Sequence, residues 1–403
     1  MNQKEFDVVI VGAGPFSCFC AILLAQQTLR VGLIYPQNTQ PMESFLHSVN
    51  ACWPSLNDPP TRAHAAHGHQ VALYLQEFCN KGTMFFYNNI LPLIEDKSNW
   101  LASECYRVGL KDFEVDELHQ ASALGFGLEK TNKNNIFKET NSAYICLDKK
   151  LFQKKIIQFL QKNNVTFIQS EVINISETQN NCNLTLANGQ QTNTEIVILG
   201  NSLNISKLLS RYNNILVPMS DCLYDYEAIL PKTNIKFPFS YRMSNGHISL
   251  VAYSILEKIF IKISGPRFLL PGAGAGINLE NVLIEDKVFN SIEKYHKDII
   301  FKFLMDELKI EIKNNFIYEK SIKCVEKRIL ADCYPCDELP ILGEFGKLGR
   351  ILGNTGWLAT GFSAGAWAAN IVCDLVLHEK SSDLHSRLQP RRFFSSFIKS
   401  NIL

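Results

Sequence analysis

The residues best suited to bind an anion lie near the N-terminus of the sequence. Gly12 and Gly14 stand two positions apart, and Pro15, Phe16 and Ser17 follow them. Gly12 would permit a tight turn, and Gly14 would let the backbone come close to a pyrophosphate because no Cβ intervenes. A helix that begins at Pro15 would direct its free N–H groups at the same phosphates. The spacing therefore predicts a phosphate-binding turn made by these five residues.

The elements that must position this turn are present on both sides of it. An apolar run of strand length (Phe6 to Val11) precedes it, a largely apolar helix (Pro15 to Gln27) follows, and a second apolar strand (Arg30 to Tyr35) comes next. This order is the opening of a dinucleotide-binding βαβ unit. Ser17 replaces the usual third glycine, and Tyr35 stands where an acidic residue usually binds the ribose. An α/β turn that binds no nucleotide is the alternative interpretation.

A second run of small residues lies near the C-terminus. Trp357 to Gly365 predicts a short strand and then a glycine loop, and Ala366 to Leu377 predicts an apolar helix. The backbone N–H groups of the loop could contact an anion or a carbonyl oxygen of a cofactor. The loop residues are Gly361, Phe362, Ser363, Ala364 and Gly365. A core helix whose small residues allow close packing is the alternative.

The composition is typical of a globular protein with a large core. The chain has 403 residues, of which 46% are hydrophobic, and a formal net charge of +1. This charge balance gives no overall electrostatic reason to expect a nucleic acid or an anionic membrane as partner. Cys333 and Cys336 form one C-x-x-C without a second pair at zinc-ligand spacing. With no leader before the first strand and no apolar run of about 18 residues, we expect a cytoplasmic protein without a membrane span.

The segment from 36 to 69 is rich in loops and contains four histidines. A loop of this length usually serves a function or wraps around a ligand. His64 and His67 would share one helix face, which could indicate a metal site, but no cysteine or carboxylate at ligand spacing completes it. We therefore expect surface or capping histidines and no metal. His69 to Cys79 predicts an amphipathic helix that stops at Gly82.

The middle of the chain predicts a return to the nucleotide-binding domain. Asp148 to Asn163 predicts an amphipathic helix, and Val165 to Ile175, which includes Val172, predicts a strand. Asn183 to Leu186 and Glu195 to Leu199 predict a hairpin-like pair that ends at Gly200. We expect Val172 and Gly200 among the cofactor contacts. The nucleotide-binding domain is therefore predicted to be discontinuous.

Residues 205 to 325 predict an antiparallel sheet that carries one or more helices. Three strands rich in aromatic residues (FPFSYRM, HISLVAYSI and KIFIKISG) are followed by a glycine-rich turn (Pro271 to Gly276) and a helix (Asn281 to Leu308). Asp337 to Gly343 then predicts a turn that enters a short strand, and Gly349 to Leu352 a hairpin arm. The predicted class is α/β, with a Rossmann-like domain at 1–82, 148–204 and 337–403, and an inserted α+β substrate domain at 83–147 and 205–336.

This order of motifs resembles the D-amino-acid oxidase superfamily of flavoproteins, which includes glycine and sarcosine oxidases. The resemblance is carried by the N-terminal βαβ unit, the hairpin that ends in glycine, D-x-x-P-I-x-G from Asp337, and A-T-G-x-x-x-G from Ala359. It covers both ends of the chain well and the middle by pattern. The resemblance implies that the discontinuous domain binds FAD.

The FAD domain of the bifunctional wobble-uridine methylaminomethyl tRNA enzyme is similar at two further places. That domain removes a carboxymethyl group from a modified amine by flavin oxidation. Its A-L-Y-P-like loop is similar to Ala51-Cys52-Trp53-Pro54, although the glycine that precedes the loop in that family is missing here, where Val49 and Asn50 stand instead. Its tail is similar to Leu388 to Phe393. The resemblance places Asn50 and Ala51 among the cofactor contacts.

The resemblance also implies the reaction. Sarcosine oxidases attach flavin through a cysteine that would fall near Leu330, and Cys333 is out of register, so we expect non-covalent FAD. An arginine before the D-x-x-P turn binds the substrate carboxylate, and Arg328 is the candidate. A hydride would pass from the carbon next to a neutral amine to flavin N5, and water would hydrolyse the imine without an obligatory general base. The loop N–H groups of Gly361 to Gly365 would stabilise negative charge at N1–C2=O of the flavin.

The expected function is therefore an FAD-dependent oxidoreductase that acts on the C–N bond of a small-molecule amine or amino acid. Two alternatives stay open. One is a tRNA wobble-uridine oxidase, which would take tRNA as its partner. The other is a partner-dependent or non-catalytic FAD-binding subunit, which the changes at Ser17 and Tyr35 leave possible.

Overall fold

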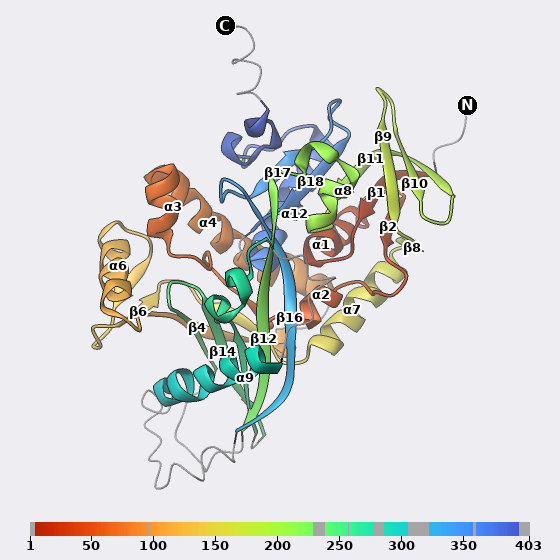
Figure 1. The fold of residues 1–403 in the computed structure, drawn as a ribbon. Helices are drawn as coiled ribbons and strands as arrows, with labels where there is room; N and C mark the ends of the chain where they lie inside the picture. The colour runs from red at the N-terminus through yellow and green to blue at the C-terminus, as the bar shows by residue number, and fades with distance from the viewer. Residues whose placement is uncertain are drawn as a thin grey trace, which may run out of the picture.

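Two sheets organise the protein (Figure 1). The computed structural model describes residues 5–94, 97–228, 238–256, 258–276, 286–304, 322–357 and 360–394. The first sheet has the strand order β17-β18-β11-β1-β2-β8, and β9 and β10 extend it from β11. Its strands are β1 (Phe6–Val11), β2 (Val31–Tyr35), β8 (Thr166–Gln169), β9 (Val172–Glu177), β10 (Cys182–Leu186), β11 (Gln191–Leu199), β17 (Ile341–Glu344) and β18 (Ile351–Thr355).

The central strands of the first sheet are parallel. β1 pairs in parallel with β2 and β11, β2 pairs with β8, and β11 pairs with β18. Val8 and Ile10 enter the core on one face of the sheet, while Val9 and Val11 enter a separate core on the other. Burial on both faces explains why β1 is apolar from Val8 to Val11. The carboxyl ends of these parallel strands share one edge, where ligands usually bind in such sheets.

The second sheet is mostly antiparallel. Its order is β16-β12-β15-β14-β13-β4-β6-β5, with β7 joining β3 to β4. Among its described strands, only β13 and β4 pair in parallel. Figure 1 shows the long β12 and β16 side by side, with one end of the pair close to the first sheet. The strands are β3 (Ala51–Cys52), β4 (Trp100–Val108), β5 (Leu128–Lys130), β6 (Ile136–Glu139), β7 (Ala143–Cys146), β12 (Leu216–Ala228), β13 (Phe239–Met243), β14 (Ile248–Ile255), β15 (Lys258–Ser264) and β16 (Ile322–Pro335).

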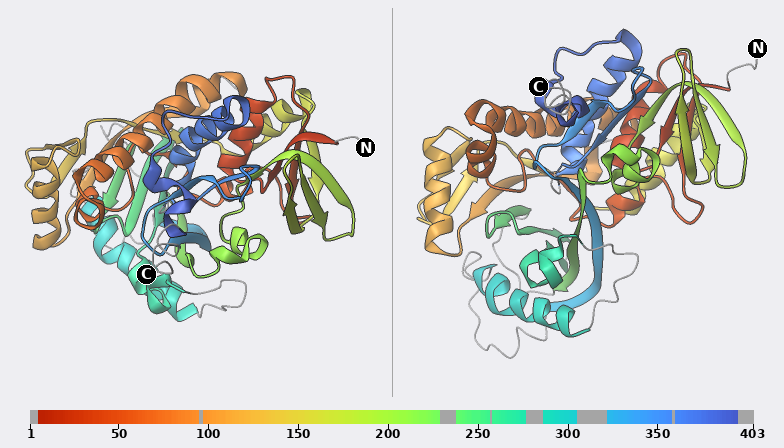
Figure 2. Two further views of the ribbon diagram at one scale, coloured as in Figure 1. Left: turned by 90° about the horizontal axis from the view of Figure 1, so that it is seen from above. Right: turned by 45° about the horizontal axis from the view of Figure 1, so that its top comes forward.

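The long helices of the first sheet pack on one of its faces, and helical segments also pack on the second sheet (Figure 2). The α-helices are α1 (Pro15–Leu24), α2 (Glu43–Leu46), α3 (Pro60–His67), α4 (His69–Phe85), α5 (Leu91–Ile94), α6 (Asp112–Ala123), α7 (Lys149–Lys162), α8 (Ile205–Leu208), α9 (Asp286–Tyr295) and α12 (Gly361–His378). Two π-helical segments, η1 (Phe86–Ile90) and η8 (His296–Phe301), continue α4 and α9. Short 3-10 turns are η2 (Lys97–Asn99), η3 (Ser202–Asn204), η4 (Ser210–Tyr212), η5 (Arg267–Leu269), η6 (Pro271–Gly274), η9 (Ser386–Leu388) and η10 (Pro390–Phe393). None of the described helices is long and apolar enough to cross a bilayer.

Three element predictions were wrong. The single strand Val165 to Ile175 is two strands, β8 and β9, because the chain turns at Ser170, whose N–H bonds to the carbonyl of Tyr35. The helix α4 passes through Gly82 instead of stopping there, since this glycine lets α4 approach α12 closely. The predicted glycine loop from Gly361 is already the first turn of α12, whose small residues are buried.

Part of the predicted helix from Asn281 to Leu308 lies outside the described residues. Within it the structure describes α9 and the π-helical segment, up to residue 304. Residues 358 and 359 of the predicted strand before α12 also lie outside the described range. The strand, turn and helix predicted at the N-terminus are confirmed, with β1 at the predicted bounds and α1 ending at Leu24.

Candidate functional site

A cavity of about 610 Å³ lies where the first sheet meets the second. The first sheet contributes the N-terminal turns of α1 and α12, the end of β11 and the turn after β18. The second sheet contributes one face of β12, β15 and β16, and residues 44–53 of the connecting segment complete the wall. The cavity therefore sits at the carboxyl ends of the parallel strands, where a cofactor would be expected.

The glycine turn presents bare backbone to the cavity. Gly14, Pro15 and Phe16 line its wall at the start of α1. A Cβ added at Gly14 would have only the Ser44 hydroxyl near it, 3.4 Å away, so backbone and ligand could approach closely there. The first N–H groups of a helix have no intrahelical acceptor. This turn fits an anionic group such as a phosphate.

Gly12 and Ser17 of the predicted motif pack against Gly200. Gly12 has φ +101°, and a Cβ there would lie 2.8 Å from the carbonyl oxygen of Gly200. A Cβ at Gly200 would in turn lie 2.1 Å from the hydroxyl of Ser17. Ser17 is buried and its hydroxyl lies 3.5 Å from the carbonyl oxygen of Gly200. Of these three, Gly200 alone lines the cavity.

Tyr35 and Val172 lie away from the cavity wall. Tyr35 is buried at the end of β2, where its ring packs edge-on against Phe167 with centroids 6.1 Å apart. Burial is the main cause that raises the pKa of the Tyr35 phenol. Val172 is buried in the core of the first sheet at the start of β9. The structure therefore does not bring either of these two predicted cofactor contacts to the cavity wall.

The start of α12 divides the five predicted loop residues into two groups. Gly361, Phe362 and Ser363 line the cavity, and a Cβ added at Gly361 would meet nothing within 4 Å. The N–H of Ala364 already bonds to the carbonyl of Thr360 at 3.2 Å. A Cβ at Gly365 would lie 3.4 Å from Phe16, so this glycine allows α1 and α12 to pack. Only the first three residues offer backbone to a ligand.

Asn50 and Ala51 differ in their position relative to the cavity. Ala51 lines the cavity, whereas Asn50 is buried behind it with φ +47°. The side-chain amide of Asn50 donates to the carbonyl of Cys146, and the N–H of Cys146 donates back to the carbonyl of Asn50 at 2.8 Å. Asn50 thereby fixes β3 against β7 and holds Ala51 and Trp53 at the wall.

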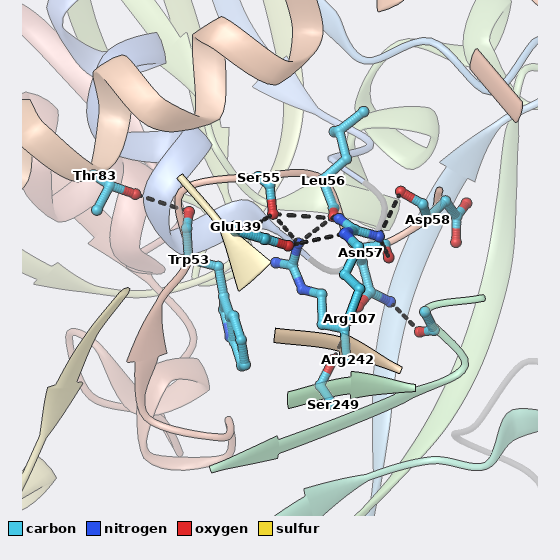
Figure 3. A network of polar contacts seen from close by, with 11 residues as sticks. Trp53, Ser55, Leu56, Asn57, Asp58, Thr83, Arg107, Glu139, Arg242 and Ser249 are labelled. Carbon is cyan, nitrogen blue, oxygen red and sulfur yellow. Dashed lines mark hydrogen bonds and ion pairs between the residues drawn. The ribbon is translucent and has the colours of Figure 1, made fainter. Parts of the chain in front are cut away.

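A buried polar network behind Trp53 was not predicted from the sequence (Figure 3). Arg107 on β4 pairs with Glu139 on β6 at 2.8 Å, and both are almost fully buried. Arg242 on β13 lies 4.0 Å from the same carboxylate and places its guanidinium 4.6 Å from the centroid of the Trp53 ring. Both arginines donate to the carbonyl of Leu56. The network fixes the loop that carries Trp53 into the cavity wall.

One face of the second sheet supplies charged groups to the cavity. Arg328 on β16 and Asp221 on β12 lie on this face, because in the register Leu223 is opposite Arg328 and Asp221 is opposite Leu330. Ser264 at the end of β15 donates its hydroxyl to the Asp221 carboxylate at 2.7 Å. Asp221 was not among the predicted site residues, since the sequence gives no sign of which strand lies beside β16.

The Arg328 side chain is mostly buried and has two weak partners. One guanidinium nitrogen donates to Nδ1 of His47, and another pairs with Glu326, whose side chain is 52% exposed. Burial and then the charge of Arg328 lower the pKa of His47, which favours the neutral imidazole that accepts this hydrogen bond. An exposed ion pair is worth about 0–1 kcal/mol. A buried ligand carboxylate could therefore displace Glu326 from Arg328.

The carboxyl of Asp221 has a raised pKa of about 6. Desolvation is the main cause, opposed by the hydrogen bond from Ser264 and the positive charge of Arg267, whereas Asp332 raises the pKa further. An acid that titrates near neutral pH in a cavity can accept or return a proton during a reaction. The site therefore combines a fixed positive charge and a titratable acid on one wall.

Cys333 faces away from this wall. It is fully buried, with its sulfur 2.9 Å from the Thr355 hydroxyl and 3.1 Å from the Ser202 hydroxyl. Burial raises the pKa of the thiol to about 11. The reactive thiolate is therefore scarce at neutral pH. Leu330, the position at which the resemblance places a flavin-linking cysteine, does line the cavity.

The tail and the histidines have structural contacts. Arg392 donates to the Asp337 carboxylate and to the carbonyls of Leu339, Pro340 and Leu388, so the tail fixes the turn before β17.

The rings of His64 and His69 pack edge-on with centroids 5.5 Å apart. Across the described residues, no three His, Cys, Asp or Glu side chains are grouped so that they could hold a metal ion.

Comparison with known proteins places this geometry in a known fold. No family model matches the chain. An uncharacterized protein of Mycoplasma genitalium is 23% identical over 138 residues, which are 34% of this chain and 20% of that protein. The chain therefore spans about a fifth of the length of this curated relative.

Solved structures match over nearly the whole chain. Glycine oxidase from Geobacillus kaustophilus has a TM-score of 0.70 at 12% identity and covers 96% of this chain and 98% of its own. L-proline dehydrogenase from P. horikoshii has a TM-score of 0.68 at 11% identity, covering 98% and 99%. Iminodiacetate oxidase from Chelativorans has a TM-score of 0.67 at 12% identity, covering 95% and 98%. The predicted fold class is confirmed: the chain has the fold of these oxidases and dehydrogenases.

Proposed function

We propose that this protein is an FAD-dependent oxidoreductase that oxidises the C–N bond of a small amine or amino acid. The observation that carries the proposal is that one cavity extends from the glycine turn at Gly14 to the charged wall at Arg328. One end suits an anionic cofactor and the other suits a carboxylate. The named activities of the structures with the same fold, on glycine, proline and iminodiacetate, support this assignment.

The residues present fit a flavin dinucleotide at its phosphate and ring portions. Gly14 and Gly361 leave space at the wall that a side chain would fill, and the N-termini of α1 and α12 both open on the cavity. The α1 end with Ser44 would hold the pyrophosphate, and the α12 end with Gly361 to Ser363 would hold the ring system. The adenosine portion would lack the usual acid, because Tyr35 at that position is buried and does not line the cavity.

When bound, the isoalloxazine ring accepts a hydride from the carbon next to the substrate nitrogen. The protein supplies the remaining requirements. Arg328 would bind the substrate carboxylate, Trp53 and Phe362 would exclude water, and backbone N–H groups at the start of α12 would stabilise negative charge. The pairing and raised pKa of Cys333 support non-covalent attachment.

The test is the visible absorption spectrum of protein purified and then incubated with FAD. Flavin bands that remain after gel filtration, pass to the supernatant on heating, and bleach anaerobically with an amine or amino acid would support the proposal. A protein that retains no flavin would contradict it. A protein that retains flavin which no member of an amino-acid and amine panel bleaches would favour the non-catalytic subunit instead.

Arg328→Ala provides a second test with a matched control. Loss of a charge-assisted hydrogen bond to a carboxylate costs about 1.5–3 kcal/mol, so KM for a carboxylate substrate should rise about 10- to 150-fold. Lys327→Ala, one residue away with its side chain paired to Glu293, should leave KM within about twofold. Equal KM values in the two variants would remove Arg328 from the site.

A further inference from the structure

Two carboxylates and one guanidinium share a wall of the cavity, and the proposed function uses only the guanidinium. Asp221 and Asp332 line the same face of the second sheet as Arg328. Charged side chains are rarely placed in a cavity without a partner that compensates their desolvation. The question is which of the two acids can act together with Arg328 on one small ligand.

Strand geometry separates the two acids. Asp332 lies four residues from Arg328 on the same strand, which is about 13 Å at 3.3 Å per residue. Asp221 is on the neighbouring strand and opposite Leu330, so it is the diagonal neighbour of Arg328. Diagonal neighbours on one face have Cα atoms about 7–8 Å apart. The shorter Cα separation makes the second pair the better match for a ligand with two charged groups on one carbon.

The hydrogen bonds of Asp221 leave it able to accept more. The Oδ2 atom accepts a hydrogen bond from the Ser264 hydroxyl at 2.7 Å, and the Oδ1 atom accepts one from the backbone N–H of Cys222 at 2.7 Å. An ionised carboxylate has about four acceptor sites, so about two stay open. An ammonium group carries three N–H donors and is the natural occupant.

We propose that Asp221 receives the ammonium group of a zwitterionic α-amino acid whose carboxylate is bound by Arg328, and that it takes one proton from this ammonium. The inference rests on the proposed function and adds the amine side of the site. In the proton transfer an N–H bond of the ammonium breaks and an O–H bond forms on Asp221. The nitrogen keeps the electron pair, and the resulting neutral amine can then lose hydride from the neighbouring carbon.

The charged groups around Asp221 determine its pH dependence. Arg267 lowers the pKa of the carboxyl and Asp332 raises it, and Ser264 stabilises the ionised form, with a resulting pKa of about 6. Among the described residues that line the cavity, Arg328 and His47 are the other titratable groups of this wall. The Asp221 carboxyl is therefore ionised at pH 7.5, and it loses its negative charge as the pH falls through about 6.

The experiment compares two probes that differ only in the amine. Isobutyrate carries the carboxylate alone, and 2-aminoisobutyrate carries both groups but has no Cα hydrogen to lose. Calorimetric titration of the FAD-loaded protein at pH 7.5 should show at least tenfold tighter binding of 2-aminoisobutyrate. This preference should disappear at pH 5. Asp221→Asn should reduce the preference below threefold and leave isobutyrate binding within about threefold.

Two milder variants keep the proposal falsifiable if Asp221→Asn folds poorly. Ser264→Ala removes a donor that favours the ionised carboxylate. The midpoint, which is the pH at which half of the preference for 2-aminoisobutyrate is lost, should therefore move to higher pH. Asp332→Asn removes a like charge, so the preference should persist at pH 7.5 and its midpoint should move to lower pH. Midpoints that move in neither direction would overturn the role of Asp221.

Failure of this inference differs from failure of the proposed function. Equal preference in the parent and Asp221→Asn, with flavin bound and bleached by an amine, would overturn the role of Asp221 alone. Failure of both probes to bind the FAD-loaded protein would overturn the amino-acid site. Absence of bound flavin in the visible spectrum would contradict the proposed function itself.

Discussion

Gly82→Ala is expected to separate α4 from α12 at the edge of the cavity. An ideal Cβ at this position would lie 2.0 Å from the carbonyl oxygen of Ser363 and 2.7 Å from its carbonyl carbon. Favourable contact between such atoms begins at about 3.5 Å. Because the contacted atoms belong to the backbone, they cannot rotate away, and one helix has to move by about 1 Å or more.

Two effects of opposite sign decide the stability of this variant. Alanine is better than glycine in a helix interior by about 1 kcal/mol. Overpacking of a core costs about 1–3 kcal/mol, and contact with a backbone carbonyl puts the cost at the upper end. We therefore expect a net loss of about 2 kcal/mol in the free energy of unfolding. Since Ser363 lines the cavity, FAD should also bind more weakly.

Urea unfolding of the apoprotein and titration with FAD measure the two effects. Gly361→Ala is the matched control, because its Cβ would meet nothing within 4 Å. It should leave stability within about 0.5 kcal/mol and weaken FAD binding, since the added methyl group enters the cavity wall. A Gly82→Ala protein as stable as the parent, or more stable, would refute the close approach of α4 and α12.

The remaining predictions concern buried charges and the tail. Glu139→Gln leaves Arg107 and Arg242 buried without their shared counter-charge and should cost about 3–5 kcal/mol in urea unfolding; a cost under about 1 kcal/mol would contradict the network. Burial lowers the pKa of His296 to about 4, against about 6.5 when unfolded, so the folded state binds fewer protons between these values. The free energy of unfolding should therefore fall as the pH falls through this window, by up to about 1.4 kcal/mol per pH unit. His296→Gln should remove this contribution, which corresponds to the uptake of one proton on unfolding. Equal slopes in the parent and the variant would argue against a neutral buried His296. Arg392→Ala removes the bonds to Asp337 and three carbonyls and should cost about 2 kcal/mol, whereas the exposed Arg391→Ala should cost almost nothing; similar losses in both would show that the tail contacts are unimportant.

Local patterns were sufficient where structure is local. The apolar run of β1, the glycine turn and the start of α1 are adjacent in sequence, so their types and order predicted this strand, turn and helix. The start of α12 was misjudged because two glycines in five residues are typical of a loop. Tertiary packing overrode that preference, since small residues there are buried against α1 and α4.

Contacts between distant strands could not be predicted. Arg107, Glu139 and Arg242 come from three strands, and no local pattern marks a charged residue that will be fully buried. Asp221 and Arg328 become neighbours only through the register of β12 and β16. Shifting that register by one residue would turn Arg328 to the opposite face of the sheet, so pairing rather than residue type creates the charged wall.

The serine in the glycine motif shows how such a departure is accommodated. The third glycine of this motif normally allows the helix to pack closely on the strands. Here Ser17 is buried at that contact, and the space for its hydroxyl exists because residue 200, at the end of β11, is itself a glycine. A Cβ at Gly200 would lie 2.1 Å from the Ser17 hydroxyl and 2.8 Å from the Phe16 ring. The small residue at this contact is therefore Gly200 at the end of β11, which faces Ser17 on α1. The close approach of α1 to the sheet is therefore retained, and the change at Ser17 alone is not a reason to expect an empty site.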